Sequence, residues 1–173
     1  MNTAKVSKSS VNSWGTINIP RVVVTGMGTI NPLGLSVKEY WEGLAAGKSA
    51  IGLISHFDAS NFRVKVDAEV RGFDATKYMD LKAIDRTSRT IQFAIAAAQE
   101  AIQSAGLDMA REEPERVGVT ISTMTEQGYV VRGWEQYQKT GPRRGADPLF
   151  ITKSTSSAAS MQVGLMLGAK GPN

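Results

Sequence analysis

The 173-residue sequence contains no cysteine and only one histidine, His56. These absences exclude a disulfide framework, a thiolate zinc site and a cysteine nucleophile within this chain. They also exclude a catalytic centre that needs two imidazoles. His56 stands next to an aromatic residue and has no nucleophile beside it, which is typical of a packed or solvated histidine. We therefore expect no metal, no cofactor and no catalytic residue in this chain.

Strong charge and long apolar runs are also absent. The chain carries 20 Lys and Arg against 16 Asp and Glu, and the excess of +4 is spread along its length. No stretch approaches the roughly 18 consecutive apolar residues of a membrane span, and the start of the chain lacks the apolar core of a secretory signal. Nucleic acid is disfavoured because no aromatic residues interleave with the basic ones for base stacking. We expect a cytoplasmic protein that binds neither membrane nor nucleic acid.

The first residues differ from the rest of the chain. Residues 1–18 are polar, rich in Ser and Asn and without hydrophobic period, which predicts a flexible leader; a tag or a linker would have the same pattern. Residues 19–173 are long enough for one domain with an apolar core. Within it, residues 22–25 and 117–122 are short apolar runs that predict buried parallel strands, side by side in one sheet. Residues 48–80 are irregular and predict a surface loop with small strands.

Four stretches predict helices, three by the spacing of their apolar residues and residues 156–167 by an apolar run. Ser36 and Glu39 form a capping box at the start of the first one. The strongest pattern covers residues 86–105, where apolar residues recur every three or four positions and an alanine-rich run indicates close packing. Residues 126–140 and 156–167 complete the set. Strands that alternate with helices predict an α/β fold around a parallel sheet, with right-handed crossovers.

Gly26 and Gly28 follow the first predicted strand, as in a dinucleotide-binding turn. The third glycine of that fingerprint belongs at position 31, where Asn31 stands, and no acidic residue ends a second strand about twenty residues later. A tight turn at the end of a buried strand explains the pair better.

Basic residues gather in two places. Lys82, Arg86 and Arg89 follow one another at spacings of four and three, so they share one side of the start of the predicted long helix. Cations there oppose the helix dipole, which indicates an external anionic partner. Arg143 and Arg144 lie in a Gly/Pro turn, from which they can reach outward. Ordinary surface charge is the alternative for both clusters.

Large apolar side chains gather around the start of the 126–140 helix. Met124, Tyr129 and Trp134 are the members of this group. Two roles fit them: they line an apolar pocket, or they pack in the core or against a partner subunit.

A series of short motifs follows in order along residues 20–173. The motifs are RVVVTGMGTINPLG at 21–34, YWEGLAAGKSAI at 40–51, IDR at 84–86, QFA at 92–94, AGL at 105–107, VGV at 117–119, GPRR at 141–144 and GAKGPN at 168–173. Together they resemble the β-ketoacyl-acyl-carrier-protein synthases, in particular the type II condensing enzymes of fatty-acid synthesis. Their fixed order makes the resemblance specific.

This resemblance implies a thiolase-like fold, in which two similar α/β halves form an α-β-α-β-α layered sandwich, and a homodimer. Such enzymes transfer an acyl group from a carrier protein to a cysteine, decarboxylate malonyl-carrier protein and join the carbanion to the acyl group. The cysteine follows the Gly-Pro-Asn motif, and two histidines and a lysine assist. Because the sequence stops at Asn173, the resemblance implies the N-terminal portion of this fold, incomplete in this chain, and no condensing activity for the chain alone.

The family's contacts with its acidic carrier protein fall on basic residues of this chain. Lys82, Arg86 and Arg89 match a patch near the start of the long helix, and Arg143 and Arg144 match a second patch. Such contacts are electrostatic, fast and sensitive to salt. The resemblance thus names acyl carrier protein as the expected partner.

The acyl pocket is the other functional region that the resemblance implies here. Thr125 matches the position that closes the far end of the pocket, and Met124 stands next to it. Where relatives have a glycine-rich stretch, residues 122–127 are bulkier and more polar, and residues 152–160 lack the usual segment with Pro and Asn. These departures leave open the acyl-chain length and the choice between fatty-acid and polyketide synthesis.

The leading hypothesis is the N-terminal fragment of a condensing enzyme. It has three forms: a partial gene product or cleaved enzyme, a protein whose remainder is another chain, or a degenerate protein without activity. The alternative is a non-catalytic partner subunit that resembles a chain-length factor and binds carrier protein. A nucleic-acid-binding module rests on charge alone. In each case, we expect exposed apolar side chains and open sheet edges where further elements belong.

Overall fold

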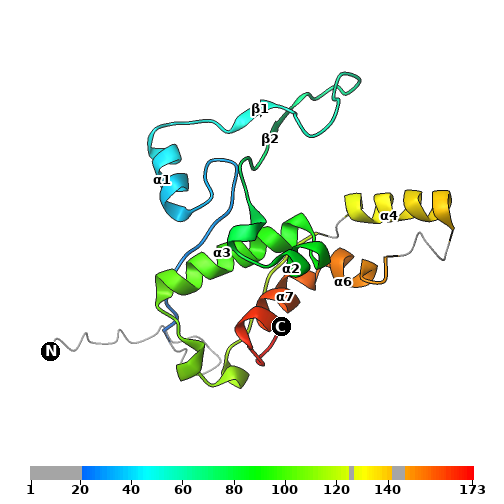
Figure 1. Cartoon of the computed structure of the whole chain (residues 1–173). Coiled ribbons are helices and arrows are strands. Elements are labelled where there is room, and N and C mark those ends of the chain that lie inside the picture. Colours follow the sequence, from blue (N-terminus) through cyan, green and yellow to red (C-terminus); the bar gives the residue numbers. More distant parts are fainter. Residues whose placement is uncertain (1–20, 125–126, 142–146) are drawn as a thin grey trace, which may run out of the picture.

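The computed structural model describes residues 21–124, 127–141 and 147–173, and these ranges are mainly helical (Figure 1). The β1–β2 hairpin is antiparallel, with Gly52 opposite Asp67, and is the only sheet in the described ranges. The elements are α1 (Val37–Ala45), β1 (Ile51–Leu53), β2 (Val66–Ala68), η1 (Ala75–Lys77), α2 (Leu81–Arg86), α3 (Arg89–Ala105), η2 (Met109–Arg111), η3 (Pro114–Arg116), α4 (Gln127–Thr140), α6 (Phe150–Ser154) and α7 (Ala158–Leu167).

The core lies where α3 packs against α7 (Figure 1). Ile91 and Ile95 of α3 meet Ala158, Ala159 and Val163 of α7, and each of these side chains is at most 6% exposed. The apolar positions recur every three or four residues, as the sequence pattern predicts. Because the alanines are small, the two helix backbones approach closely and bury the isoleucines between them.

The helix predicted over residues 86–105 begins later than expected, because the chain leaves helical geometry at Thr87. Thr87 has φ −122° and ψ 147°, and its hydroxyl donates to the carbonyl of Ala83 at 2.7 Å. Ser88 then caps α3 through a hydroxyl that accepts from the backbone N–H three residues on, at 3.4 Å. α3 therefore begins at Arg89, and the expected start at residue 86 is wrong.

Gly26 and Gly28 allow the segment before α1 to lie directly against α3. A Cβ atom at Gly28 would stand 1.9 Å from the carbonyl oxygen of Ala97, and one at Gly26 would stand 2.3 Å from that of Ala101. No side chain fits at either place, so the close approach to the helix requires glycine. Neither residue lies in a turn, which corrects the expected tight turn: the pair serves packing on the alanine-rich face of α3.

The two predicted parallel strands are wrong. Residues 22–25 and 117–122 belong to no sheet in the described structure, and Val24 is 82% exposed. Within the described ranges no backbone hydrogen bond joins the two segments; instead, the Val119 N–H donates to the Pro172 carbonyl at 2.9 Å. A parallel strand needs neighbours that pair with its backbone and layers that cover both faces. The described residues provide too few of either.

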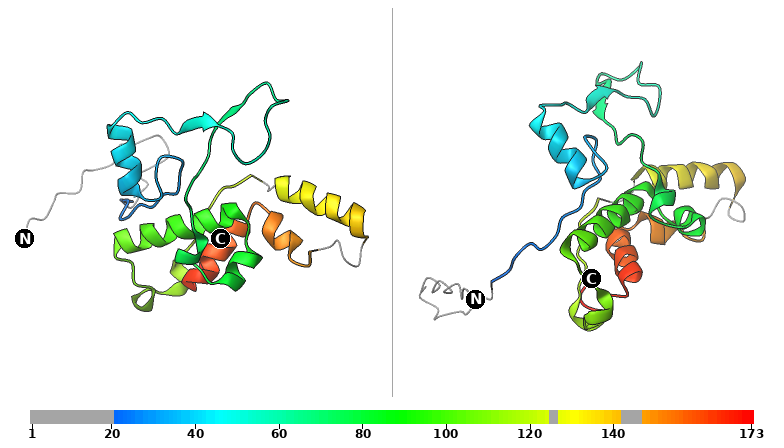
Figure 2. Two further views of the ribbon diagram at one scale, coloured as in Figure 1. Left: turned by 45° about the horizontal axis from the view of Figure 1, so that its top comes forward. Right: turned by 60° about the vertical axis from the view of Figure 1, so that its left-hand side comes forward.

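α1 has the predicted cap, but its apolar face is uncovered. The Glu39 N–H donates to Ser36 Oγ at 3.2 Å, and the Glu39 carboxylate accepts from the Leu35 N–H at 2.6 Å. Trp41 is 69% exposed and Leu44 45%. Figure 2 shows the β1–β2 hairpin set apart from the α3–α7 core, whereas the first residue of α1 is tied to α3, because the Val37 N–H donates to Glu100 Oε1 at 2.8 Å. The expectation of exposed apolar surface is therefore confirmed.

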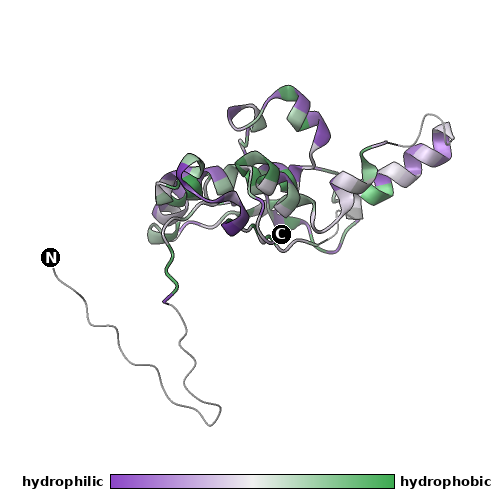
Figure 3. Ribbon diagram, turned by 90° about the horizontal axis from the view of Figure 1, so that it is seen from below, coloured by the Kyte–Doolittle hydropathy of each residue, from purple (hydrophilic) through white to green (hydrophobic). Residues whose placement is uncertain are grey.

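The helices predicted at residues 126–140 and 156–167 are present as α4 and α7. α4 extends to one side of the α3–α7 core (Figure 3). The leader expected at residues 1–18 lies outside the described residues. In the described ranges, no helix combines the length and the apolar composition that a membrane crossing requires.

Candidate functional site

α2 is a short helix that presents two of the predicted carrier-facing cations. Asp80 caps it, because its Oδ1 accepts from a backbone N–H of the first turn at 2.7 Å. Lys82 and Arg86 are four residues apart, so they lie on one face, and both are exposed. Over the ranges that the structure describes, neither side chain has a hydrogen bond or ion pair. This face is therefore free to meet an anionic partner; Arg143 and Arg144 lie outside the described residues.

The electrostatic position of these cations differs from the expectation. Arg86 lies in the last turn of α2, where a cation complements the helix dipole. The predicted conflict with the dipole at the start of one long helix therefore does not arise for Arg86. The free face of α2 remains the feature that favours an external partner.

Arg89, the third member of the predicted cluster, has a different environment. Its Nη2 atom donates to the carbonyl oxygen of Val70 at 3.1 Å. Its guanidinium carbon lies 4.8 Å from the ring centre of Phe93 and 5.8 Å from that of Phe73, within the range of cation–π attraction. The structure thus brings the protein's own groups beside Arg89, whereas the two cations of α2 have no partner among the residues that it describes.

The rings around Arg89 belong to an aromatic cluster that ties the segment before α2 to α3. Phe73 meets Phe93 edge to face at 4.8 Å between ring centres and stacks on Tyr78 at 5.6 Å. The Gln99 side-chain amide donates to the Tyr78 carbonyl at 3.0 Å. These contacts hold residues 70–80, which lead directly into α2. The sequence offers no periodic signal for the cluster, because its members come from a loop and a helix.

The three large apolar residues near the start of α4, Met124, Tyr129 and Trp134, do not share one site in the described structure. Met124 is 82% exposed, and Thr125 lies outside the described residues. Tyr129 stacks on Phe150 of α6 at 5.7 Å between ring centres, whereas Trp134 is 61% exposed. Tyr129 therefore has the packing role that was the alternative to a pocket.

A groove of about 320 Å³ lies along residues 120–123, just before the predicted pocket residues in the sequence. The Thr123 hydroxyl donates across it to the Ser156 carbonyl at 2.8 Å. Serine and threonine side chains give this groove a polar wall. The residues that line it are Thr120, Ile121, Ser122, Thr123, Ser156, Ser157, Ser160 and Asn173.

Tyr129, Asp147 and Lys153 form a polar cluster between α4 and α6 that the sequence analysis missed. The Tyr129 hydroxyl donates to Asp147 Oδ2, which also accepts from the Lys153 ammonium at 2.9 Å. These two hydrogen bonds lower the pKa of Asp147 to about 2. Burial, together with the hydrogen bond to Asp147, raises the pKa of Tyr129. A tyrosine with a raised pKa is a poor base at neutral pH, so the cluster holds α4 on α6 rather than moving protons.

Lys153 is the most deeply placed charge of this cluster, with 9% of the residue exposed. Burial by itself lowers the pKa of Lys153, but the hydrogen bonds with Asp147 and Tyr129 outweigh it and leave the pKa raised. The ammonium therefore stays charged and paired, as a buried charge requires. Only spacing in three dimensions reveals the cluster, because its members are six and eighteen residues apart.

His56 lies near a buried carboxylate but not in a catalytic arrangement. Glu69 is 6% exposed and accepts from the Ser55 hydroxyl at 2.6 Å. The hydrogen bonds from Ser55, side chain first and backbone second, lower the pKa of Glu69 to about 2. His56 Nε2 is 3.9 Å from Glu69 Oε1, and its side chain is 62% exposed. Because the serine donates to the carboxylate, the imidazole is not its base, and the predicted solvated histidine is confirmed.

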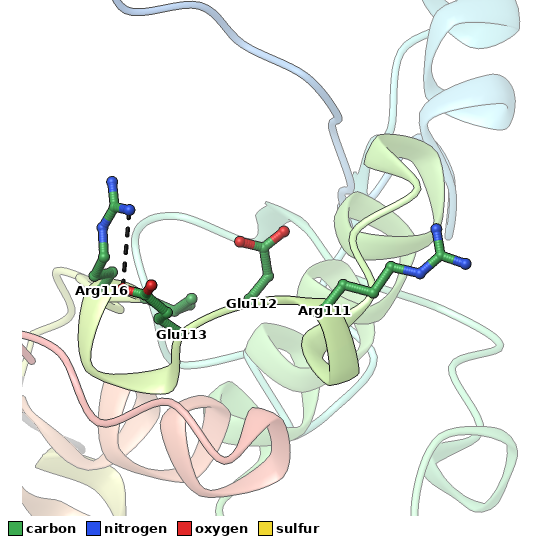
Figure 4. A pocket seen from close by; sticks show the side chains of 5 residues that line it. Arg111, Glu112, Glu113 and Arg116 are labelled. Carbon is green, nitrogen blue, oxygen red and sulfur yellow. Dashed lines mark ion pairs between the residues drawn. The ribbon is translucent and has the colours of Figure 1, made fainter.

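The charged bend before residue 117 encloses a shallow polar pocket of about 250 Å³ (Figure 4). Arg111 pairs with Asp108 at 3.2 Å and Arg116 with Glu113 at 3.9 Å, and all four side chains are more than half exposed. Exposed pairs of this kind contribute little. Over the described ranges, no group of three or more His, Asp or Glu could hold a metal ion. The bend is therefore a solvated surface.

Comparison with known proteins defines the class. The model of the β-ketoacyl synthase N-terminal domain matches residues 20–173. Over 154 residues the chain is 38% identical to 3-oxoacyl-[acyl-carrier-protein] synthase 2 of Coxiella burnetii, a match that covers 88% of this chain and 37% of that protein. The chain belongs to the β-ketoacyl synthase family and spans little more than a third of the length of this curated relative.

Solved structures share the fold. The ishigamide ketosynthase/chain length factor aligns with a TM-score of 0.76 and 28% identity, over 87% of this chain and 38% of that one. A type II polyketide acyl-carrier protein in complex with its ketosynthase bound to the hexaketide gives 0.70 and 20% identity, over 86% and 39%. The predicted fold class, the N-terminal portion of a thiolase-like layered α/β sandwich, is confirmed, although the two expected strands are not formed.

Proposed function

We propose that this chain is the N-terminal part of a β-ketoacyl-acyl-carrier-protein synthase. The whole protein condenses malonyl-carrier protein with an acyl thioester by decarboxylative Claisen condensation, in fatty-acid or polyketide synthesis, and is thus an acyltransferase. The observation that carries this proposal is the family match over residues 20–173, with 38% identity to a 3-oxoacyl-[acyl-carrier-protein] synthase 2.

The chemistry of condensation needs groups that these 173 residues lack. No cysteine is present to form the acyl thioester. The single imidazole, His56, is exposed and lies beside Glu69, so it cannot act as one of a pair that stabilises the charge of decarboxylation. We therefore expect the chain alone to be inactive.

A radiolabelled malonyl-carrier assay tests both statements. A protein that continues past Asn173 and supplies the nucleophile should release labelled carbon dioxide and form a β-ketoacyl product. The purified 173-residue chain should give neither. Turnover by the short chain would contradict the expected inactivity, and failure of the longer protein with every acyl donor would contradict the proposed reaction.

Acyl carrier protein is the partner that this function implies. The support is the exposed face of α2, where Lys82 and Arg86 have no partners in the described ranges, with Arg89 nearby. Arg143 and Arg144 are proposed as the second contact. Carrier proteins are acidic, so opposite charges would steer the encounter. Reversal of Arg143 and Arg144 to Glu in the intact enzyme should weaken carrier binding, and unchanged affinity at low salt would count against these two residues.

A non-catalytic partner subunit is the second candidate, favoured by the likeness to a ketosynthase/chain length factor at a TM-score of 0.76. Such a subunit would keep the carrier-facing charges and lack the nucleophile. The residue at the nucleophile position beyond Asn173 discriminates between the two. A cysteine there with measurable turnover supports the enzyme; another residue with carrier binding and no turnover supports the partner subunit.

We place Met124 and Thr125 at the acyl pocket of the whole protein, and we propose the cytoplasm as its location.

The proposed assembly is a homodimer. The support for the dimer is the outward face of α4, on which Val131 is 55% and Trp134 61% exposed. Exposed apolar faces of this kind mark contact surfaces. Sedimentation of the whole protein tests the dimer, and Trp134→Glu should shift it toward monomer; a monomeric wild-type protein would overturn the proposal.

A further inference from the structure

We propose that Arg89 is a positioning residue that orients α2 and does not itself contact the carrier protein. This inference rests on the proposed function, because it divides the carrier-facing cluster into two roles. Lys82 and Arg86 supply charge to the partner. Arg89 sets the place of the helix that presents them.

The first argument is that Arg89, although exposed, already contacts a backbone carbonyl and two rings of its own chain. One side of the guanidinium donates to the Val70 carbonyl at 3.1 Å. Two rings lie beside it, with centres at 4.8 Å (Phe93) and 5.8 Å (Phe73). A planar, weakly hydrated guanidinium suits such a place, since it can stack on rings and donate at its edge at the same time.

The second argument is where these contacts lead. Val70 and Phe73 lie on the return from β2, and residues 74–80 continue from there through η1 to α2. Phe93 is four residues after Arg89 on α3, so the two side chains share a face of that helix. Arg89 therefore links two parts of the chain: the first turn of α3 and the start of the segment that leads into α2.

The third argument is that α2 has few other restraints. It is six residues long and none of its residues is buried. Its ends are held by the Asp80 cap and by the Thr87 hydroxyl, which donates to the Ala83 carbonyl at 2.7 Å. These bonds are local and keep α2 helical. At the C-terminal end of α2, the side-chain amide of Gln92 in α3 donates to the carbonyl oxygens of Ile84 and Thr87, each at 3.3 Å. The Arg89 site and the aromatic cluster restrain the other end of α2, because they hold the segment that leads into its first turn.

The test separates charge from geometry in the full-length protein, with purified acyl carrier protein as the probe. Association rate and affinity are measured over a range of salt concentrations, together with the thermal midpoint. Lys82→Gln and Arg86→Gln remove the proposed contacts. Arg89→Gln removes the charge but keeps a planar amide that can donate to the Val70 carbonyl. Lys48→Gln, an exposed residue after α1, controls for net charge.

We expect Lys82→Gln and Arg86→Gln each to lower the association rate at low salt by about threefold and to flatten its salt dependence, at an unchanged thermal midpoint. Arg89→Gln should leave the salt dependence of the wild type, as should Lys48→Gln. If Arg89→Gln flattened the salt dependence as much as Lys82→Gln does, Arg89 would touch the carrier and the inference would be overturned.

Two further variants test the positioning itself. Arg89→Ala removes the guanidinium and with it the contacts to the Val70 carbonyl and the two phenylalanine rings. Phe73→Leu removes one of these rings and keeps the charges of Lys82, Arg86 and Arg89. Both should weaken carrier affinity by about threefold with the wild-type salt dependence, and lower the thermal midpoint by about 2–3 °C. Wild-type affinity in both variants would overturn the inference. If Lys82→Gln and Arg86→Gln also leave carrier binding unchanged, the proposed docking face on α2 is wrong. The thermal midpoints of Arg89→Ala and Arg89→Gln still measure the contacts of Arg89 with Val70, Phe73 and Phe93.

Discussion

α7 and α4 are both helices with apolar side chains, yet one is buried and the other is largely exposed. Ala158, Ala159 and Val163 of α7 are at most 3% exposed, whereas Val131 and Trp134 of α4 are 55% and 61% exposed. α7 has small residues that let it lie close against α3, and its partner is within the described ranges. α4 has large side chains that need a broad partner surface. The difference shows which contacts are complete in this chain.

α4 is nevertheless held at one end, and by polar contacts instead of apolar ones. Tyr129 stacks on Phe150, and its hydroxyl joins Asp147 and Lys153. A satisfied polar network in a partly buried place fixes direction, because each bond demands a particular geometry. The α3–α7 pair is held by the burial of apolar side chains, and the α4–α6 pair is held by hydrogen bonds and a ring contact of defined geometry.

The largest test of this contrast is a cavity in the α3–α7 core. Ile91→Ala should reduce the free energy of unfolding by about 3 kcal/mol, because Ile91 is 2% exposed and the lost atoms leave a void. Ile51→Ala is the matched control, since Ile51 is 66% exposed and should cost less than about 0.5 kcal/mol. Equal effects in chemical denaturation would mean that the core lies elsewhere.

The second test concerns the α4–α6 cluster. Lys153→Met should cost about 1–3 kcal/mol, because it deprives Asp147 of a partly buried, charge-assisted hydrogen bond. Lys38→Met removes an ion pair with Glu42 whose side chains are 84% and 62% exposed, and should cost less than about 0.5 kcal/mol. If the two substitutions cost the same, the cluster adds nothing beyond an ordinary surface pair.

The third test uses acid. The folded pKa of Asp147 is about 2, below the ordinary value of 3.8, so its contribution to stability is fully present above the ordinary value and is lost as the pH falls through about 2. Asp147→Asn should therefore be less stable than the wild type near neutral pH, and the gap should shrink from about pH 4 downward. Denaturant titrations at several pH values measure this gap, and a gap that does not change with pH would contradict the assigned hydrogen bonds.

The smallest expected effect on stability is on the exposed face of α4. Trp134→Ala should change the free energy of unfolding by less than about 0.5 kcal/mol, since Trp134 is 61% exposed. It should, however, reduce the fluorescence of a dye that binds exposed apolar surface. Lys139→Ala on the same helix is the control and should leave the dye signal unchanged. A large loss of stability in Trp134→Ala would mean that this face is already covered.

Local signals in the sequence predicted the helices well and the strands poorly. The cap at Ser36, the three- and four-residue spacing around Ile91 and the apolar run around Val163 depend on neighbours in sequence, and the helices they predict are present in the structure. The strands at residues 22–25 and 117–122 depend on pairing with distant backbone, and neither formed. The break at Thr87 is an intermediate case, because a hydroxyl that bonds back to Ala83 competes with continued helix.

The candidate site divides in the same way. The sequence indicated Lys82 and Arg86 as a charged face, and both are exposed on α2. It grouped Arg89 with them, because spacing cannot show that two rings and a carbonyl oxygen surround that side chain. The Tyr129–Asp147–Lys153 cluster had no sequence signal, since three scattered polar residues form no periodic pattern.

By itself the sequence determined the family, through the order of its motifs, and the positions of the helices, through caps and hydrophobic period. Tertiary structure alone decided which faces are covered, which cations are free and where polar groups meet. The physical reason is range: a cap or an amphipathic period acts within a few residues. A strand ladder, a cation between rings or a buried ion pair exists only after segments far apart in the chain have come together.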